Sequence, residues 1–555
     1  MRKLIFACAA AALAATACIK VDNSLGSGLV DKSLLYDTYT VEFPLTNIQM
    51  KRSSDLSGYS STRVVVGAIR DDVFGLTTRE SAFPLIPAKD TLDLGTNPRP
   101  VSFSIYFAAD SVSCADDSQT RIMQNIYATE LSAALDPEKT ASNTEIAHSE
   151  ALITDGVPVY NGSGPIRFTF TKAFAQKYLD GLKALAPDGV MVNRKEWSEE
   201  QIEARYKEYV SALPGIHLRT DEPSGNGGRI NLFGLSSLDV DSNQSLYINN
   251  NLAILYYTND EVAGKDTTLA VVFFPGEMSF LDEDSSIDSG TRFYQFAFNR
   301  TTHSYPEGPA GAQLLVEGGS GVKPVMSAKE IYDKSKAAIE EKGGSITNTI
   351  VTKATIVLPY DMPADYRDMK YYPGILSPTI RRTTTGDDGK TTVQFAGLTD
   401  ASVSTENQGD IDRYNLVYSP DISYHVQEIL KRTDLDTADD ADIWFLTIFT
   451  EQIAQAQDSE QNAYMQQLIY AAYYNSLYGG GYGYGGYGGY GGYGYNSYNN
   501  YYTYAMLAQM MSAASQTQYT TNTELDKDRY YRAILCGPDA ARKPFFRITF
   551  AVSKK

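Results

Sequence analysis

Apolar and polar residues alternate with a period of two in several short stretches of this chain of 555 residues. In residues 101–107 (VSFSIYF), the residues at odd positions are Val, Phe, Ile and Phe, and the intervening ones are Ser, Ser and Tyr. Because an extended strand turns successive side chains to opposite faces, this pattern predicts strands with one buried face. The same alternation, or the continuous apolar run of a fully buried strand, recurs at 166–171, 251–257, 269–274, 354–358 and 546–552.

Helical patterns are fewer, and they lie between the strands. Residues 198–211 begin with a capping box from Ser198 to Gln201, and residues 327–342 end at a Gly-Gly pair. Further helices are expected at 451–477 and 504–517. Many strands with few helices favour β-sandwiches over a doubly wound sheet.

We therefore expect a mainly β chain with two tandem antiparallel β-sandwich domains of jelly-roll-like form. Residues 35–305 would form the first domain. Residues 306–450, completed by 521–555, would form the second. Residues 451–520 would be an inserted helical hairpin near the C-terminus with a Gly/Tyr-rich flexible tip.

The tip of this expected hairpin has an unusual composition. Residues 473–504 hold 13 of the 40 tyrosines and 11 of the 43 glycines of the chain. Glycine at this density gives the backbone too much freedom to order, so a flexible loop is expected. Three roles remain open for it: a sugar-stacking surface, self-association through tyrosine, or a low-complexity insert without a specific role.

The N-terminus has the three parts of an export signal, namely a basic start, an apolar stretch and small residues before Cys18. We interpret residues 1–17 as a lipoprotein signal peptide, Cys18 as the lipidated residue, and residues 18–34 as a polar tether. The alternative is an ordinary secretory signal with an incidental cysteine. Beyond residue 17 no apolar run approaches the ~20 residues of a membrane-spanning helix.

The net charge of the chain limits the class of partner that it can bind. The formal charge is −19, and loss of the signal peptide would make it −21. This acidic balance argues against a nucleic-acid partner, because nucleic-acid binding needs Lys and Arg against phosphates.

Cys114 and Cys536 are the cysteines expected in the folded body. An exported protein permits a disulfide between them, but two separate buried thiols are favoured.

Motifs of catalysis and metal binding are lacking in the sequence. The four histidines, His148, His217, His303 and His425, are isolated along the chain, and neither HExxH nor Cys-x-x-Cys occurs. The glycine-rich stretch 318–321 lacks the Lys-Thr of a phosphate loop.

In the acidic run 239–245, Gln244 and Asn250 stand where a calcium loop needs glycine and glutamate, and the run 282–290 has carboxylates without a fixed spacing. Both are interpreted as solvated loops, with calcium binding as the alternative. We predict no catalytic residue, no metal site and no cofactor, and the ligand-binding residues stay unassigned.

Seven blocks in order resemble a Bacteroidota lipoprotein family catalogued as domain of unknown function 4270. They are SLGSGLVD (24–31), VVVGAIRDDVFGLTTRESAFPL (64–85), GIHLRTDEP (215–223), LLVEGGSGVK (314–323), ATIVLPYDMPADYRDMKYYPGILSP (354–378), ISYHVQEIL (422–430) and RAILCGPDAARKPFFRITF (532–550). The resemblance implies an outer-membrane lipoprotein with a β-rich body, facing either the periplasm or the cell surface. It implies no catalytic residues.

Three functions follow as expectations. The first is a membrane-anchored cell-envelope lipoprotein with a non-catalytic binding role, for a glycan or a partner protein. The second is a structural subunit of an outer-membrane protein complex. The third is a polysaccharide hydrolase, whose paired carboxylates would converge only in the folded chain.

Overall fold

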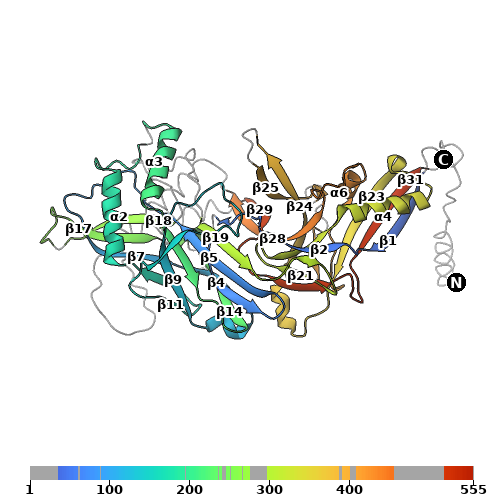
Figure 1. Ribbon diagram of the computed structural model, residues 1–555, viewed down its shortest axis with the longest axis horizontal. Coiled ribbons are helices and arrows are strands. Elements are labelled where there is room, and N and C mark those ends of the chain that lie inside the picture. The colour runs from blue at the N-terminus through green and yellow to red at the C-terminus, as the bar shows by residue number, and fades with distance from the viewer. Residues whose placement is uncertain are drawn as a thin grey trace, which may run out of the picture.

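The computed structural model shows an elongated molecule with two β-rich lobes (Figure 1). It describes residues 36–60, 63–87, 89–193, 196–235, 237–240, 246–249, 252–265, 267–275, 297–386, 391–400, 408–455 and 518–553. The first lobe carries α2 (Lys172–Leu185) and α3 (Glu199–Ala212), and the second carries α4 (Ala328–Glu341) and α6 (Ser423–Ile429). The sheets are antiparallel throughout the described strands, so the expected mainly β class is confirmed.

Two sheets form the first lobe. The ten-stranded sheet has the order β10-β9-β13-β5-β4-β14-β8, with β11 on β9 and with β19 joining β3 and β5. Its strands are β3 (Tyr59–Ser60), β4 (Arg63–Asp71), β5 (Gly75–Phe83), β8 (Ala109–Cys114), β9 (Gln124–Leu131), β10 (His148–Leu152), β11 (Val159–Tyr160), β13 (Ile216–Thr220), β14 (Gly227–Gly234) and β19 (Ala297–His303). The five-stranded sheet has the order β12 (Ile166–Thr169), β7 (Arg99–Phe107), β17 (Ala253–Thr258), β18 (Leu269–Pro275) and β6 (Leu85–Pro87). A separate hairpin pairs β15 (Ser237–Val240) with β16 (Leu246–Asn249).

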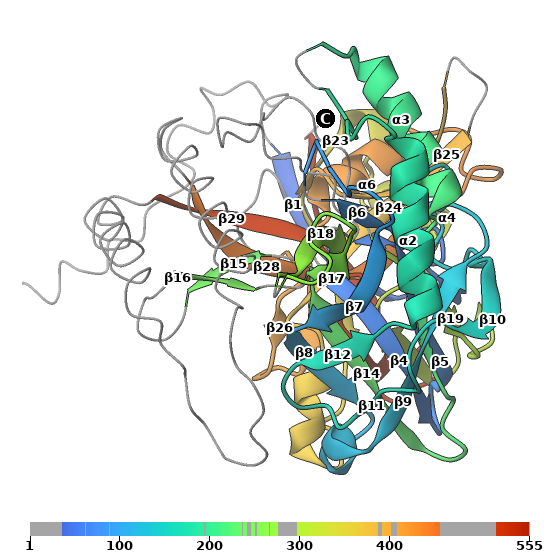
Figure 2. The same cartoon turned by 90° about the vertical axis from the view of Figure 1, so that its left-hand side faces the viewer.

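The core of the first lobe lies between these sheets and the two helices. Phe103 of β7 is fully buried, and its ring centroid lies 4.8 Å from that of Phe170 and 5.4 Å from that of Tyr178 on α2. Figure 2 shows α2 and α3 on the same side of this lobe, near β7. The α3 helix begins with the predicted capping box of Ser198, whereas α2 was not predicted.

A fully buried arginine joins a loop to the ten-stranded sheet in the same lobe. Arg229 of β14 donates from Nη1 to the carbonyl oxygens of Thr120 (3.1 Å) and Ile122 (2.6 Å). Its Nη2 donates to Tyr160 O over 3.0 Å and its Nε to Asn231 Oδ1 over 2.7 Å. The loop contains the 3₁₀ helix η2 (Asp117–Arg121). A buried guanidinium is tolerated here because carbonyl and amide oxygens satisfy its donors.

Two larger sheets and one ribbon form the second lobe. The five-stranded sheet has the order β1 (Tyr36–Pro44), β31 (Phe545–Ser553), β23 (Thr349–Pro359), β27 (Val417–Tyr418) and β26 (Ile411–Asp412). The seven-stranded sheet has the order β20 (Gly308–Pro309), β2 (Ile48–Arg52), β22 (Val322–Met326), β28 (Ile443–Gln455), β24 (Ile375–Thr385) and β25 (Thr391–Gly397), with β29 (Gln518–Leu525) on β28. The ribbon pairs β21 (Gln313–Glu317) with β30 (Arg532–Cys536), and two 3₁₀ helices, η3 (Ile346–Asn348) and η4 (Tyr366–Tyr371), lie in the connections.

The first described strand pairs with the last one. Tyr39 of β1 faces Phe550 of β31, and their ring centroids are 5.9 Å apart. The next strand, β2, pairs with β22 in the seven-stranded sheet. The first domain was expected to begin at residue 35. The strand pairing instead places residues 36–52 in the second lobe. Sequence order did not indicate this, because β1 and β31 lie about 500 residues apart and β2 and β22 about 270 residues apart.

The expected helix at 451–477 is wrong in its first residues. Residues 451–455 continue β28, and their partners are residues 518–522 of β29 in a continuous antiparallel register. Ladder hydrogen bonds to β29 override the helical preference of this Gln- and Ala-containing stretch. Residues 456–517 lie outside the described residues, and so do the Gly/Tyr-rich stretch 473–504 and the expected helix 504–517.

The other expected elements are found with small shifts of their ends. The strands expected at 101–107, 166–171, 251–257, 269–274, 354–358 and 546–552 correspond to β7, β12, β17, β18, β23 and β31. The helix expected at 327–342 is α4, and Ser327 caps it. Residues 1–35, including Cys18, the signal peptide and the tether, lie outside the described residues. Within the described part of the chain, every helix is too short or too polar to cross a membrane.

Candidate functional site

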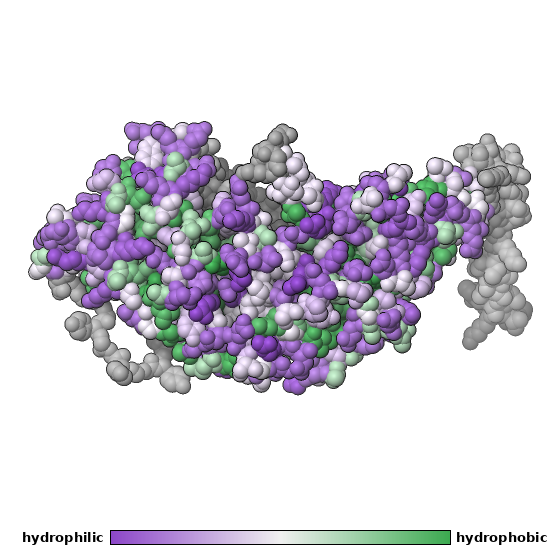
Figure 3. Space-filling view, in the orientation of Figure 1, coloured by the Kyte–Doolittle hydropathy of each residue, from purple (hydrophilic) through white to green (hydrophobic). Residues whose placement is uncertain are grey.

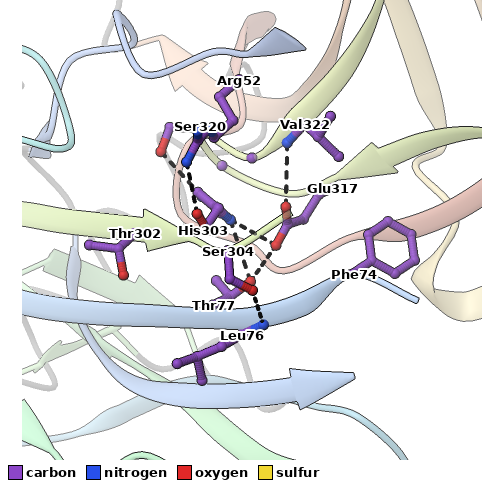
Figure 4. Close-up of polar contacts among 12 residues, drawn as sticks. Arg52, Phe74, Leu76, Thr77, Thr302, His303, Ser304, Glu317, Ser320 and Val322 are labelled. Carbon is purple, nitrogen blue, oxygen red and sulfur yellow. Dashed lines mark hydrogen bonds and ion pairs between the residues drawn. The ribbon is translucent and has the colours of Figure 1, made fainter. Parts of the chain in front are cut away.

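A cluster of buried polar side chains lies where the two lobes meet (Figure 4). Glu317 ends β21 of the second lobe, whereas His303 ends β19 and Thr77 lies on β5 of the first lobe. Glu317 Oε1 lies 2.7 Å from His303 Nδ1 and accepts a hydrogen bond from Thr77 Oγ1. Its Oε2 accepts a bond from the backbone N–H of Val322 over 3.3 Å. One carboxylate therefore joins strands of both lobes.

The glycine-rich stretch 318–321 forms the turn beside this carboxylate. Lys323 Nζ donates to the backbone carbonyl oxygens of Glu317, Gly319 (3.0 Å) and Gly321 (3.2 Å). Three acceptors match the three N–H bonds of an ammonium group. The turn thus directs carbonyl oxygens at a cation, whereas a phosphate loop directs N–H groups at an anion. Gly319 has a φ of +58°, and a Cβ there would collide with the guanidinium of Arg79.

Charge pairing sets the protonation of this cluster. Burial alone would raise the pKa of Glu317, but the charge and hydrogen bond of His303 and the bond from Thr77 lower it below its ordinary value. Burial lowers the pKa of His303, against the attraction of Glu317. Glu317 and Lys323 are fully buried and His303 is nearly so. A substrate has no access to these groups, so the cluster acts as a structural joint between the lobes.

The burial of Lys323 leads us to expect that the free energy of unfolding depends on pH. Burial lowers its pKa to about 7, from an ordinary value of 10.5. Between these pH values the unfolded chain holds one more proton than the folded chain, so the free energy of unfolding rises with pH, by roughly 1 kcal/mol per pH unit. Chemical unfolding of the wild type and of Lys323→Met between pH 7.5 and 9.5 checks this. Equal slopes in the two proteins would contradict it.

The structure brings together two histidines that are isolated in the sequence. The rings of His148 and His217 stack with their centroids 4.1 Å apart, and Thr129 Oγ1 lies 3.4 and 3.3 Å from their Nδ1 atoms. His217 Nε2 lies 3.2 Å from Glu80 Oε2. Strand pairing of β9 with β10 and β13 creates this pair, which sequence spacing did not predict. Among the described residues, no group of His, Cys, Asp and Glu could hold a metal ion.

Cys114 and Cys536 are free and buried in separate places, as the favoured interpretation predicted. Burial raises the pKa of both thiols. Of the acidic run 239–245, only Asp239 and Val240 are described, and they belong to β15. The run 282–290 lies outside the described residues.

A cleft of about 550 Å³ opens in the second lobe between the β24–β25 hairpin and α6. Figure 1 shows this hairpin projecting beside α6, and Figure 3 shows the same projection on a mostly hydrophilic surface. The lining residues from β24, β25 and the turn after β25 are Ile380, Arg382, Thr383, Thr384, Gly397, Leu398 and Thr399. Those from α6 and the following loop are Tyr424, His425, Glu428, Ile429, Arg432, Asp440 and Ala441.

Asp400 fixes the first turn of α6, whose residues Tyr424 and His425 line the cleft. Its carboxylate accepts hydrogen bonds from the backbone N–H groups of Tyr424 (2.6 Å) and His425 (3.1 Å). Burial raises the pKa of Asp400, against these two bonds. The His425 ring is buried, and its Nε2 lies 3.0 Å from Ala441 O, which is a structural role. The Tyr424 side chain is 45% exposed and lies at the cleft.

Ion pairs hold most of the charged groups around the cleft. Arg432 binds Asp440 through Nη1 (3.1 Å) and Nη2 (2.9 Å), and it binds Asp434 over 2.7 Å. The hydrogen bonds to these two carboxylates raise the pKa of Arg432. Glu428 accepts a bond from Lys431 over 2.7 Å. The Arg382 guanidinium has no hydrogen-bond or ion-pair partner among the described residues.

Sequence analysis singled out only His425 from this cleft. Two β-strands and a helix that follows about 25 residues later form the lining, so no contiguous motif marks it. The exposed end of β24, with its run of Arg and Thr residues, was the one local signal. Comparison of the chain with known protein families, curated proteins and solved structures finds no match.

Proposed function

We propose that this protein is a lipoprotein of the bacterial outer membrane, anchored through Cys18, that binds a glycan without catalysing its cleavage. The observation that carries the binding role is the open cleft between the β24–β25 hairpin and α6. The signal-like N-terminus and the resemblance to the Bacteroidota family support the location. Both the periplasmic and the outward orientation fit this proposal.

The size and chemistry of the cleft support a sugar ligand. Ligand pockets commonly measure about 300–1,000 Å³, and this cleft lies within that range. The Tyr424 ring offers an amphipathic face on which the C–H bonds of a sugar ring can pack. Thr383 and Thr399 also line the cleft, and a threonine hydroxyl can exchange hydrogen bonds with sugar hydroxyls.

The carboxylates of the cleft favour binding over hydrolysis. A glycosidase needs one carboxyl group that holds a proton for the leaving oxygen and a second that stays free to act. Both oxygens of Asp440 contact Arg432, and Glu428 is bonded to Lys431. Both carboxylates are thus already bound by cations of the protein, so neither is free to reach a glycosidic oxygen.

Replacing Tyr424 by alanine is expected to weaken glycan binding by about tenfold, because the stacking surface is lost. Full-length protein in detergent would be screened on immobilised polysaccharides, and the affinity for the best ligand would be measured for wild type and variant.

Tyr414→Ala is the matched control, because Tyr414 is almost fully exposed and does not line the cleft. It should bind as the wild type does. Retention on no polysaccharide, or equal losses in the two tyrosine variants, would refute glycan binding at this cleft.

A further inference from the structure

We propose that the cleft selects a saccharide that carries an anionic group, a carboxylate or a sulfate, and that Arg382 binds this group. This inference rests on the proposed function, because it concerns the ligand class of the same cleft. It assigns the specificity of the site to one side chain.

The register of β24 directs Arg382 into the cleft. Successive side chains of a strand point to opposite faces, so Arg382 shares a face with Ile380 and Thr384, which also line the cleft; Thr383 lines it as well, whereas Arg381 does not. The adjacent Arg381 points to the other face, where its Nε donates to Asp55 Oδ2 over 2.7 Å. Two neighbouring arginines therefore differ sharply: one is engaged by a carboxylate, and the other is presented to the cleft.

The charges around the cleft leave this guanidinium available. The carboxylate oxygens of Asp440 and Asp434 contact Arg432, and Glu428 contacts Lys431. Among the described residues that line the cleft, Arg382 is the cation without a charged partner. On a chain with a formal charge of −19, such a free cation in a concave site is a local attraction for an anion.

The shape of the guanidinium narrows the ligand class. Its planar fork donates two parallel hydrogen bonds to a carboxylate or a sulfate, and such bidentate bonds are stronger than those between neutral groups. Tyr424, which lines the same cleft from α6, would hold the sugar ring that carries the anion. Uronic acids and sulfated sugars share this chemistry.

Two matched pairs of polysaccharides test the proposal on the full-length protein in detergent at low ionic strength. Polygalacturonate is compared with its fully methyl-esterified form, and dextran sulfate with dextran. We expect the anionic member of at least one pair to bind about tenfold more tightly than its neutral member, as loss of a charge-assisted hydrogen bond predicts. The pair that shows the difference identifies carboxylate or sulfate as the group bound.

Arg382→Gln should lower the affinity for the anionic member about tenfold and leave the neutral member unchanged. Arg381→Gln is the matched control, since it removes the same charge one residue away, and it should keep wild-type affinity. Thermal unfolding of both variants confirms that they are folded.

The results separate this inference from the proposed function. Tyr424-dependent binding that is equal for the charged and neutral members, or equal losses in Arg381→Gln and Arg382→Gln, would overturn the role of Arg382 while glycan binding stands. Retention on no polysaccharide would overturn both proposals.

Discussion

Replacing Glu317 by alanine is expected to lower the free energy of unfolding by about 3–5 kcal/mol, because three buried hydrogen-bonding partners lose their acceptor at a cost of about 1–3 kcal/mol each. The carboxylate is fully buried and contacts His303, Thr77 and the backbone N–H of Val322. Its removal leaves these groups without an acceptor. It also leaves a cavity at the junction of the lobes.

Equilibrium unfolding in urea measures the effect. Glu42→Ala is the matched control: Glu42 forms a 2.6 Å ion pair with Arg547, but both side chains are about half exposed, so a loss of about 0–1 kcal/mol is expected. Glu317→Gln should fall between the two, since it keeps the volume and one acceptor oxygen. A loss below about 1 kcal/mol in Glu317→Ala would show that the cluster does not join the lobes.

Replacing Cys18 by serine is expected to move the protein from the membrane fraction to the soluble fraction. Each buried CH₂ of an acyl chain contributes about 0.8 kcal/mol to membrane binding, so a multiply acylated cysteine is a lasting anchor. Serine offers no sulfur for lipidation. Fractionation of cells, with mass spectrometry of the N-terminal peptide, measures the change.

Cys8→Ser is the control for this substitution, because Cys8 lies inside the expected signal peptide and would be removed with it. It should leave membrane attachment intact. Membrane attachment of Cys18→Ser equal to the wild type would refute the lipid anchor and would favour a secretory signal with an incidental cysteine.

Local sequence patterns predicted those strands and helices whose signals lie within a short stretch of the chain. The alternation in VSFSIYF became β7, and the capping box of Ser198 and Gln201 begins α3. The signal for α2 was also local, with Thr171 as the cap and Phe174, Tyr178 and Leu182 spaced by four residues, but it was missed. The helix expected at residue 451 failed because β29, beginning more than 60 residues later, pairs with that segment.

The polar cluster at the junction shows where local patterns fail. The stretch 318–321 stands out in the sequence only as glycine-rich, and its role appears only beside Lys323 and Arg79. His303 was called isolated, and Glu317 reaches it from a strand of the other lobe. The spacing of residues along the chain does not indicate which of them will lie close together in the folded protein.

The sequence alone determined the mainly β class and the places of several strands and helices, because each depends on residues within about one element of each other. The export signal and the lipid anchor stay predictions from the sequence. The tertiary structure decided that β1 pairs with β31, that Glu317 joins the lobes, and that Arg382 and Tyr424 share a cleft. These are contacts between distant segments, and burial of apolar faces, rather than any local signal, selects them. The binding role that we propose for this chain therefore rests on a site that only the folded protein assembles.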